Sequence, residues 1–251
     1  VPIETDLRGV LEKRDRRTGF IGEGLPAQNQ NVEGIPNSEP VPEDAPLYMG
    51  FQTNHGTKEQ HPFHGETDAT FVHNQNSEYG VMIKEGRFKY GTTQHVSRLR
   101  LELEEWYENH SLDERVNKMF GGQFNADLVG TTGEDARESR VFTEQRDLDT
   151  TGGLVGHAEK MALAREQGVP RLLRRDFDTA DNDRAGVNFV SLQEEIADFV
   201  QTRSVMNGER FQNVDGIDQQ QNNGILEFVT AESRANFLVP PQELRSLPRP
   251  Q

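Results

Sequence analysis

The order of the strands and helices predicted after residue 92 most strongly constrains how this chain of 251 residues can fold. The first predicted strand runs to about residue 104. It is marked by the apolar residues Val96, Leu99, Leu101 and Leu103. A short helix is expected next, because Ser111 can serve as its N-cap, Glu114 completes a capping box and Gly121 provides a stop.

The C-terminal half contains the remaining predicted elements. In chain order they are a helix at 157–168, a strand at 170–178, a strand at 185–193, a helix within 191–208 and a strand at 234–241. Gly168 is expected to end the first of these helices, and Ile196, Phe199 and Val200 lie at helical spacing in the second. Apart from the one inserted helix, this is the split βαββαβ order. We therefore expect an α+β, ferredoxin-like fold with an antiparallel sheet and helices on one face.

The first 86 residues lack a sustained periodicity, so we predict an irregular segment over 1–86 and a ferredoxin-like domain over 87–251. Residues 23–48 are rich in Pro, Asn and Glu, and a polar loop follows at 52–80. This loop holds four histidines, which are His55, His61, His64 and His73. Their spacing is irregular, which favours a solvated loop over a metal site.

Composition excludes several classes of protein. Acidic residues outnumber basic ones 42 to 27, giving a net charge of −15, which argues against nucleic acid as a partner. Strong acidity with Arg favoured over Lys predicts a halophilic source, because concentrated salt screens the repulsion. No stretch reaches the roughly 18 apolar residues of a membrane span, so we expect a soluble protein. The absence of cysteine excludes disulfides, thiolate metal sites and Cys nucleophiles.

The chain begins at Val1 rather than Met and carries no signal-peptide pattern. We therefore expect a processed or incomplete chain, and its export and compartment stay open.

His157 follows a glycine-rich turn at the start of a predicted helix. A lone histidine is more often a surface or core residue than a ligand. Here, however, no Cys, no HExxH motif and no second His at i+3 or i+4 completes a zinc site. A single imidazole suits haem iron, because the porphyrin supplies the other four donors.

Arg174 and Arg175 are neighbours on a predicted strand, so they point to opposite faces of the sheet. One guanidinium would serve as a fixed positive charge over a haem. The alternative is a surface arginine together with a salt bridge to one of the many nearby acidic residues.

With these residues in place, the region 87–245 resembles the dye-decolorizing (DyP-type) haem peroxidases. The motifs that carry the resemblance are, in order, GTTQHVSRLRLELEEWYENHSLDERVNKMFG, GHAEK, LLRRDFD, GVNFVSLQ, MNG and ILEFVTAESRANFLVPP. The resemblance implies the dimeric α+β-barrel class of ferredoxin-like folds and haem b as cofactor. It also implies oxidation of an organic electron donor by hydrogen peroxide, in a haloarchaeal-like member of the family.

On the cofactor side, the resemblance implies that His157 is the proximal ligand of the haem iron. Glu227, in ILEF, matches an acid beside that histidine, where a carboxylate makes the imidazole more basic. Phe189, in GVNFVSLQ, would contact the cofactor. Arg175 would bind a haem propionate or a surface acid.

On the peroxide side, the resemblance makes Arg174 the distal arginine and Asp176 a distal polar residue. The family's distal motif, Gly-x-x-Asp-Gly, has its nearest match in FIGEG (20–24), where Glu23 replaces the aspartate that moves the peroxide proton. Family members also carry a ferredoxin-like half before this motif, and only about twenty residues precede it here. We therefore expect a fragment, a separate N-terminal half, or completion of the site in an oligomer.

Two other functions remain open from the sequence. One is another haem protein of the same superfamily, with chlorite dismutase-like or deferrochelatase-like activity. The other is a haem-free halophilic binding or structural protein.

Overall fold

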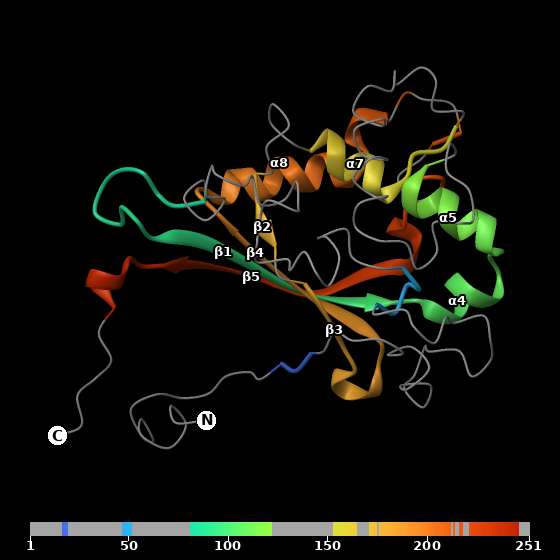
Figure 1. The fold of residues 1–251 in the computed structure, drawn as a ribbon, viewed down its shortest axis with the longest axis horizontal. Helices are drawn as coiled ribbons and strands as arrows, with labels where there is room; N and C mark the ends of the chain where they lie inside the picture. The colour runs from blue at the N-terminus through green and yellow to red at the C-terminus, as the bar shows by residue number, and fades with distance from the viewer. Residues whose placement is uncertain are drawn as a thin grey trace, which may run out of the picture.

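The computed structural model describes residues 17–19, 47–51, 81–121, 153–164, 171–174, 176–211, 213, 216–217 and 221–245 (Figure 1). Their centre is an antiparallel sheet. Its strands are β1 (Thr92–Leu101), β2 (Leu173–Arg174), β3 (Phe177–Thr179), β4 (Gly186–Gln193) and β5 (Val229–Val239). The strand order is β2-β4-β1-β5, and β3 also pairs with β4.

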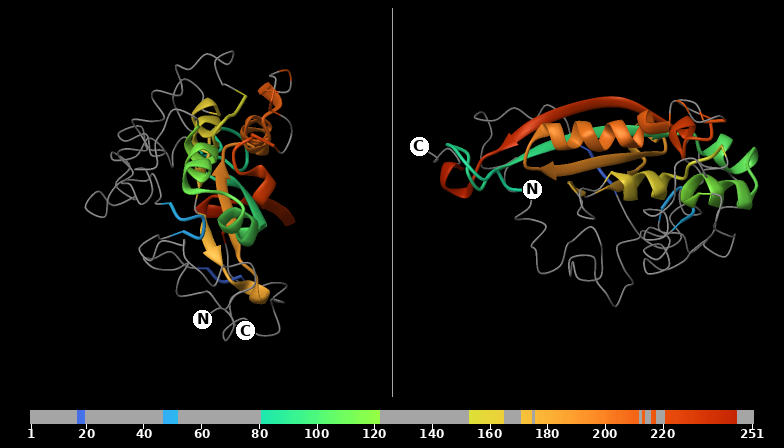
Figure 2. Two further views of the ribbon diagram at one scale, coloured as in Figure 1. Left: turned by 90° about the vertical axis from the view of Figure 1, so that its right-hand side faces the viewer. Right: turned by 90° about the horizontal axis from the view of Figure 1, so that it is seen from above.

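Two helices lie over one face of this sheet, as Figures 1 and 2 show. They are α7 (His157–Leu163) and α8 (Ile196–Met206). Two more helices, α4 (Leu103–Glu108) and α5 (Leu112–Phe120), lie at the end of the sheet where β1 finishes. Short 3₁₀ turns occupy Asp181–Asp183, Glu209–Phe211, Leu226–Phe228 and Gln242–Leu244. The expected α+β, ferredoxin-like arrangement is confirmed, because β2 and β3 together take the place of one strand beside β4.

Helix α5 begins and ends where local sequence signals predicted. The Ser111 hydroxyl accepts a hydrogen bond from the Glu114 amide at 3.3 Å, and the Glu114 carboxylate accepts one from the Ser111 amide at 2.8 Å. Gly121 follows the helix with φ of 94°, in the left-handed region that favours glycine. The predicted capping box and stop are therefore confirmed.

The first strand is shorter than its apolar pattern predicted. Strand β1 ends at Leu101, and Leu103 already begins α4. Leu103, Trp106 and Tyr107 are all buried, and their i, i+3, i+4 spacing places them on one face of a helix. The alternation up to Leu103 is typical of a strand, but packing of this face against the core decides for a helix.

Two other predicted elements differ in extent, and one helix differs in its packed face. The strand predicted at 170–178 is divided into β2 and β3, and the last strand begins at Val229 rather than Arg234. In α8, Val200 is exposed, so it does not belong to the packed face with Phe199. The predicted end of the helix at Gly168 lies outside the described residues.

A compact aromatic core holds the helices at the end of the sheet. Phe51 packs edge-on against Phe120 with ring centroids 5.3 Å apart, and Trp106 packs likewise against Phe228 at 4.8 Å. The Trp106 indole N–H donates to the Met49 carbonyl at 3.1 Å, so residues 47–51 join this core.

The domain boundary at residues 86 and 87 stays a prediction. Among the described residues, no helix is long and apolar enough to cross a membrane.

Candidate functional site

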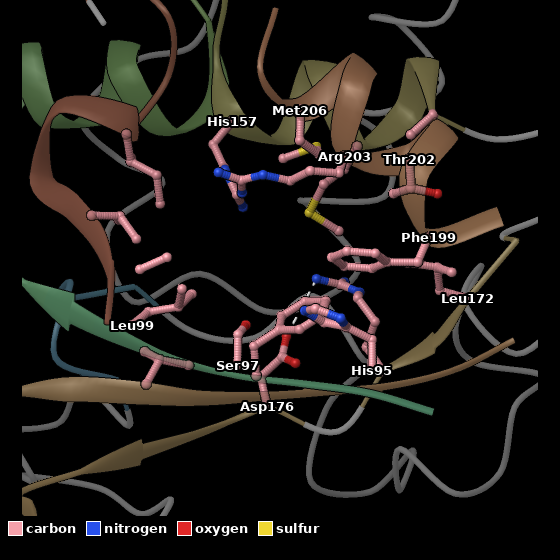
Figure 3. Close-up of a pocket in the computed structure, with 18 of the residues that line it drawn as sticks. His95, Ser97, Leu99, His157, Leu172, Asp176, Phe199, Thr202, Arg203 and Met206 are labelled. Atoms are coloured by element: carbon pink, nitrogen blue, oxygen red, sulfur yellow. Dashed lines mark hydrogen bonds and ion pairs between the residues drawn. The ribbon is translucent and has the colours of Figure 1, made fainter. Parts of the chain in front are cut away.

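A pocket of about 240 Å³ lies between the sheet and the helices that cover it (Figure 3). Strand β1 lines it with alternate residues, which are His95, Ser97, Leu99 and Leu101. Side chains two apart on a strand share a face, so the strand itself sets this row. The volume is just below the range of about 300–1,000 Å³ that is usual for small-molecule sites.

The helix wall of the pocket combines one imidazole and one guanidinium with apolar side chains. His157 and Met161 come from α7, and Phe199, Arg203 and Met206 come from α8. These residues recur at spacings of three and four, which places each set on one helix face. Figure 3 shows His157 and Arg203 on the helix side and Ser97, Asp176 and His95 on the sheet side.

His157 is held at the first residue of α7 by close packing against α5. A Cβ at Gly156 would lie 2.2 Å from the Gly121 amide nitrogen, so this approach requires a glycine. The buried Glu159 carboxylate accepts a hydrogen bond from the Gly156 amide at 2.6 Å, which further fixes the start of the helix.

The His157 ring is neutral in this environment. Burial lowers its pKa to about 3, and the nearby charges of Lys160, Arg174 and Arg203 act in the same direction. A neutral imidazole has a free lone pair, which is the form that binds a metal. His157 can therefore serve as a metal ligand at neutral pH.

Lys160 anchors α7 from behind the pocket. Its side chain is fully buried, and Nζ donates to the Asn223 carbonyl and side-chain oxygen, both at 2.7 Å, and to the Met206 carbonyl at 2.8 Å. Burial lowers its pKa to about 7, and Arg203 contributes to the lowering. These three hydrogen bonds tie α7 to the end of α8 and fix the helix turn that follows His157.

A row of charged residues lies on the sheet side. Arg174 pairs in register with Ser191 and lines the pocket, and its Nη1 lies 3.4 Å from the Asp176 carboxylate. Asp178 lies two residues after Asp176 in the sequence. It is buried, and its carboxylate accepts a hydrogen bond from the Tyr48 amide at 2.7 Å. Burial raises the pKa of Asp178 to about 7, and the negative charge of Asp176 raises it further. Asp178 thus titrates near neutral pH, opposite Val187, which lines the pocket.

Stability should depend on pH through Asp178. Its pKa rises from 3.8 when unperturbed to about 7 in the fold, so between these values the folded state holds a proton that the unfolded state has lost. The free energy of unfolding should therefore fall as pH rises through this window, by roughly 1.4 kcal/mol for each unit of the pKa difference. Denaturant unfolding at several pH values should show this slope in the wild type, and Asp178→Asn should flatten it. Parallel pH curves for the two proteins would contradict the assignment.

The other residues predicted for the site are placed as follows. Phe189 lines the pocket from β4. Glu227 forms an ion pair with Lys118 of α5, and no hydrogen bond among the described residues joins it to His157. Glu23 and Arg175 lie outside the described residues, as does the cluster of four histidines at 55–73. The structure thus brings together His157, Arg174, Asp176 and Phe189.

His95, Arg203 and Arg234 are among the pocket residues that were not predicted from the sequence. His95 is buried, bonds through Nδ1 to the Asn236 side-chain oxygen at 2.7 Å and stacks on Phe199 with ring centroids 3.6 Å apart. Arg203 and Arg234 line the pocket from α8 and β5. The alternation of β1 and the helical spacing from Phe199 could have indicated His95 and Arg203. No comparable sequence signal marks Arg234.

Residues 1–241 match the model of a family of unknown function, DUF7405. The chain belongs to this family. No curated protein matches this DUF7405 chain.

Among solved structures, the DUF7405 chain is similar to DyP-type peroxidases at low sequence identity. A dye-decolorizing peroxidase from Bacteroides thetaiotaomicron matches 97% of this chain and 60% of its own, with 13% identity and a TM-score of 0.52. The encapsulated DyP-type peroxidase from Mycobacterium smegmatis matches 96% of this chain and 60% of its own, with 14% identity and a TM-score of 0.51. A DypB variant from Rhodococcus jostii, solved in complex with heme, matches 81% of this chain and 55% of its own, with 15% identity and a TM-score of 0.48. The two likenesses with TM-scores above 0.5 show a fold like that of DyP-type peroxidases. The chain spans less than two thirds of the length of these proteins.

Proposed function

We propose that this chain forms the haem site of a DyP-type peroxidase, which oxidises an organic donor with hydrogen peroxide. One observation carries the proposal. A neutral imidazole, His157, lies on the helix side of an apolar pocket, and the Arg174 and Asp176 pair lies on its sheet side. The similarity in fold to DyP-type peroxidases supports the proposal.

The residues present fit a haem. His157 offers an uncharged nitrogen to the pocket, and no described residue forms a hydrogen bond with its ring. Leu99, Met161 and Phe189 supply apolar walls of the kind that a tetrapyrrole ring contacts. Glu227, the expected carboxylate partner of His157, forms an ion pair with Lys118 through one of its two oxygens.

Haem iron, when bound, would supply the redox chemistry with peroxide. The roles of the chain's own residues follow from the chemistry of their side chains. His157 holds the cofactor at one nitrogen. Arg174 stabilises negative charge that develops beside it. The Asp176 carboxylate orients the Arg174 guanidinium and can hold a proton on a carboxylate oxygen. Glu23 stays our candidate for the acid that moves the peroxide proton.

Reconstitution of the full chain with haem b tests this function. We expect a Soret band at one haem per chain and oxidation of an organic dye that requires peroxide. A protein that forms no Soret complex would contradict the proposal. Turnover of chlorite in place of dye oxidation would favour the related haem activity instead.

A haem-free binding protein is the second candidate. The observation that favours it is the pairing of Glu227 with Lys118, which removes the expected support of a haem ligand. The halophilic source, and completion of the site by another half or copy, stay predictions.

A further inference from the structure

The pocket carries an excess of positive charge in an acidic protein. Among the residues that the structure describes, its lining contains four arginines and one carboxylate, which are Arg171, Arg174, Arg203, Arg234 and Asp176. The whole chain has a net charge of −15, so this local balance is opposite in sign to that of the chain. A pocket of this kind concentrates anionic ligands.

Two of the four guanidinium groups have acidic neighbours. Arg174 lies 3.4 Å from Asp176, and Arg171 lies 3.7 Å from Asp198. Within the described part of the chain, neither Arg203 nor Arg234 has an ion pair or a side-chain hydrogen bond.

These two arginines act on one another and on the same part of the pocket. Burial lowers the pKa of Arg203, and the like charge of Arg234 adds to the effect. Both charges also contribute to the lowered pKa of His95, after burial, which is the largest cause. Two neighbouring like charges are unfavourable unless an anion lies between them. The apo pocket is therefore prepared for a negative group.

A β-bulge in β5 places Arg234 at the pocket. Leu99 pairs with Ala231, but Arg98 pairs with Ser233, so Glu232 is the extra residue of β5. After the bulge Arg234 lies opposite Ser97, which lines the pocket from β1. Without the extra residue, the alternation of β5 would turn Arg234 to the other face of the sheet.

From this geometry we infer that Arg203 and Arg234 form an anion subsite at the α8 and β5 end of the pocket, which binds the carboxylate groups of its ligand. The inference deepens the proposed function. It rests on that function where the carboxylates belong to a tetrapyrrole. The source is either the acid side chains of a tetrapyrrole or a free aromatic acid that serves as electron donor. Arg203 binds from within the pocket, and Arg234 binds from its exposed rim.

Metal-free protoporphyrin IX and its dimethyl ester provide the main test, read by the anisotropy of porphyrin fluorescence. Arg203→Gln and Arg234→Gln should each weaken binding of the diacid roughly tenfold, as expected for one charge-assisted hydrogen bond. The ester should bind the wild type more weakly and be insensitive to both substitutions. Arg87→Gln, on an exposed turn, is the matched control and should change nothing. Equal binding of diacid and ester, with no effect of either substitution, would overturn the tetrapyrrole source.

Calorimetry with 4-hydroxybenzoate and its methyl ester tests the second source. Binding of the acid alone, weakened by Arg203→Gln and unaffected by bound porphyrin, would assign the subsite to a free carboxylate. Displacement of the acid by porphyrin would assign it to the tetrapyrrole. If acid and ester bind equally well, both for protoporphyrin IX and for 4-hydroxybenzoate, the inference is overturned.

Thermal melting of the apo variants separates binding from a structural role. Because each substitution removes a like charge, Arg203→Gln and Arg234→Gln should melt no lower than the wild type. Lower melting with unchanged ligand affinity would show a structural role and overturn the inference. Neither the porphyrin nor the benzoate requires iron or His157 for binding. The subsite can therefore be confirmed even if reconstitution with haem fails, and haem can bind even if the subsite is refuted.

Discussion

Replacement of His157 by alanine is expected to abolish the Soret band of the reconstituted protein. No second imidazole is available from α7. Among the described residues, the only other histidine that lines the pocket is His95, which lies on the sheet side and stacks on Phe199. Loss of a sole metal ligand removes the coordination on which affinity depends. We expect haem titration of His157→Ala to show only the spectrum of free haem, and peroxide-dependent dye oxidation to fall to background.

Imidazole rescue separates ligation from folding. Truncation of His157 leaves a space the size of its ring, so added imidazole should restore a Soret band in His157→Ala. His110→Ala is the control, because His110 lies outside the pocket and packs against Phe228. An unchanged Soret band in His157→Ala without imidazole would refute the ligand assignment.

Arg174→Ala is expected to keep the Soret band but to lower kcat/KM for peroxide by roughly 100- to 1,000-fold, the usual cost of losing one preorganised group that stabilises developing charge. Arg174 can have this effect because its position opposite Ser191 turns it into the pocket and Asp176 holds its guanidinium. Steady-state kinetics at varied peroxide concentration measure the change.

Arg174→Lys sharpens this test. Lysine keeps the positive charge but lacks the planar fork, so its kcat/KM should lie between those of Arg174→Ala and the wild type. Arg87→Ala should retain full activity, since Arg87 is exposed and does not line the pocket. Full activity of Arg174→Ala with haem bound would exclude the role proposed for Arg174.

Much of the fold followed from local sequence signals. The capping of α5, the start of α7 at His157 and the strand at 186–193 were all predicted at or within a residue of their observed limits. Each depends on neighbours in sequence, such as an N-cap side chain or a run of apolar residues. The end of β1 was wrong because Leu103 continues the alternation of the strand, while burial beside Trp106 and Tyr107 favours a helix.

The site was predictable only in part. His157, Arg174, Asp176 and Phe189 were singled out from the sequence, and the structure places all four around one pocket. Glu227 was expected beside His157, but Lys118 of α5 lies close enough to bind it instead. The two residues are far apart in sequence, and nothing in the motif ILEF indicates where α5 packs.

The sequence by itself determined the order of strands and helices and the position of His157 at the start of a helix. It also predicted that Arg174 and Arg175 point to opposite faces of the sheet. These are short-range properties, set by backbone geometry and side-chain spacing. Only the tertiary structure decided which charges meet in the pocket. The bulge at Glu232 turns Arg234 towards Arg203, and burial makes His157 neutral and lets Asp178 keep a proton. Register and desolvation arise from contacts between distant segments, so the chain acquires them only when it folds.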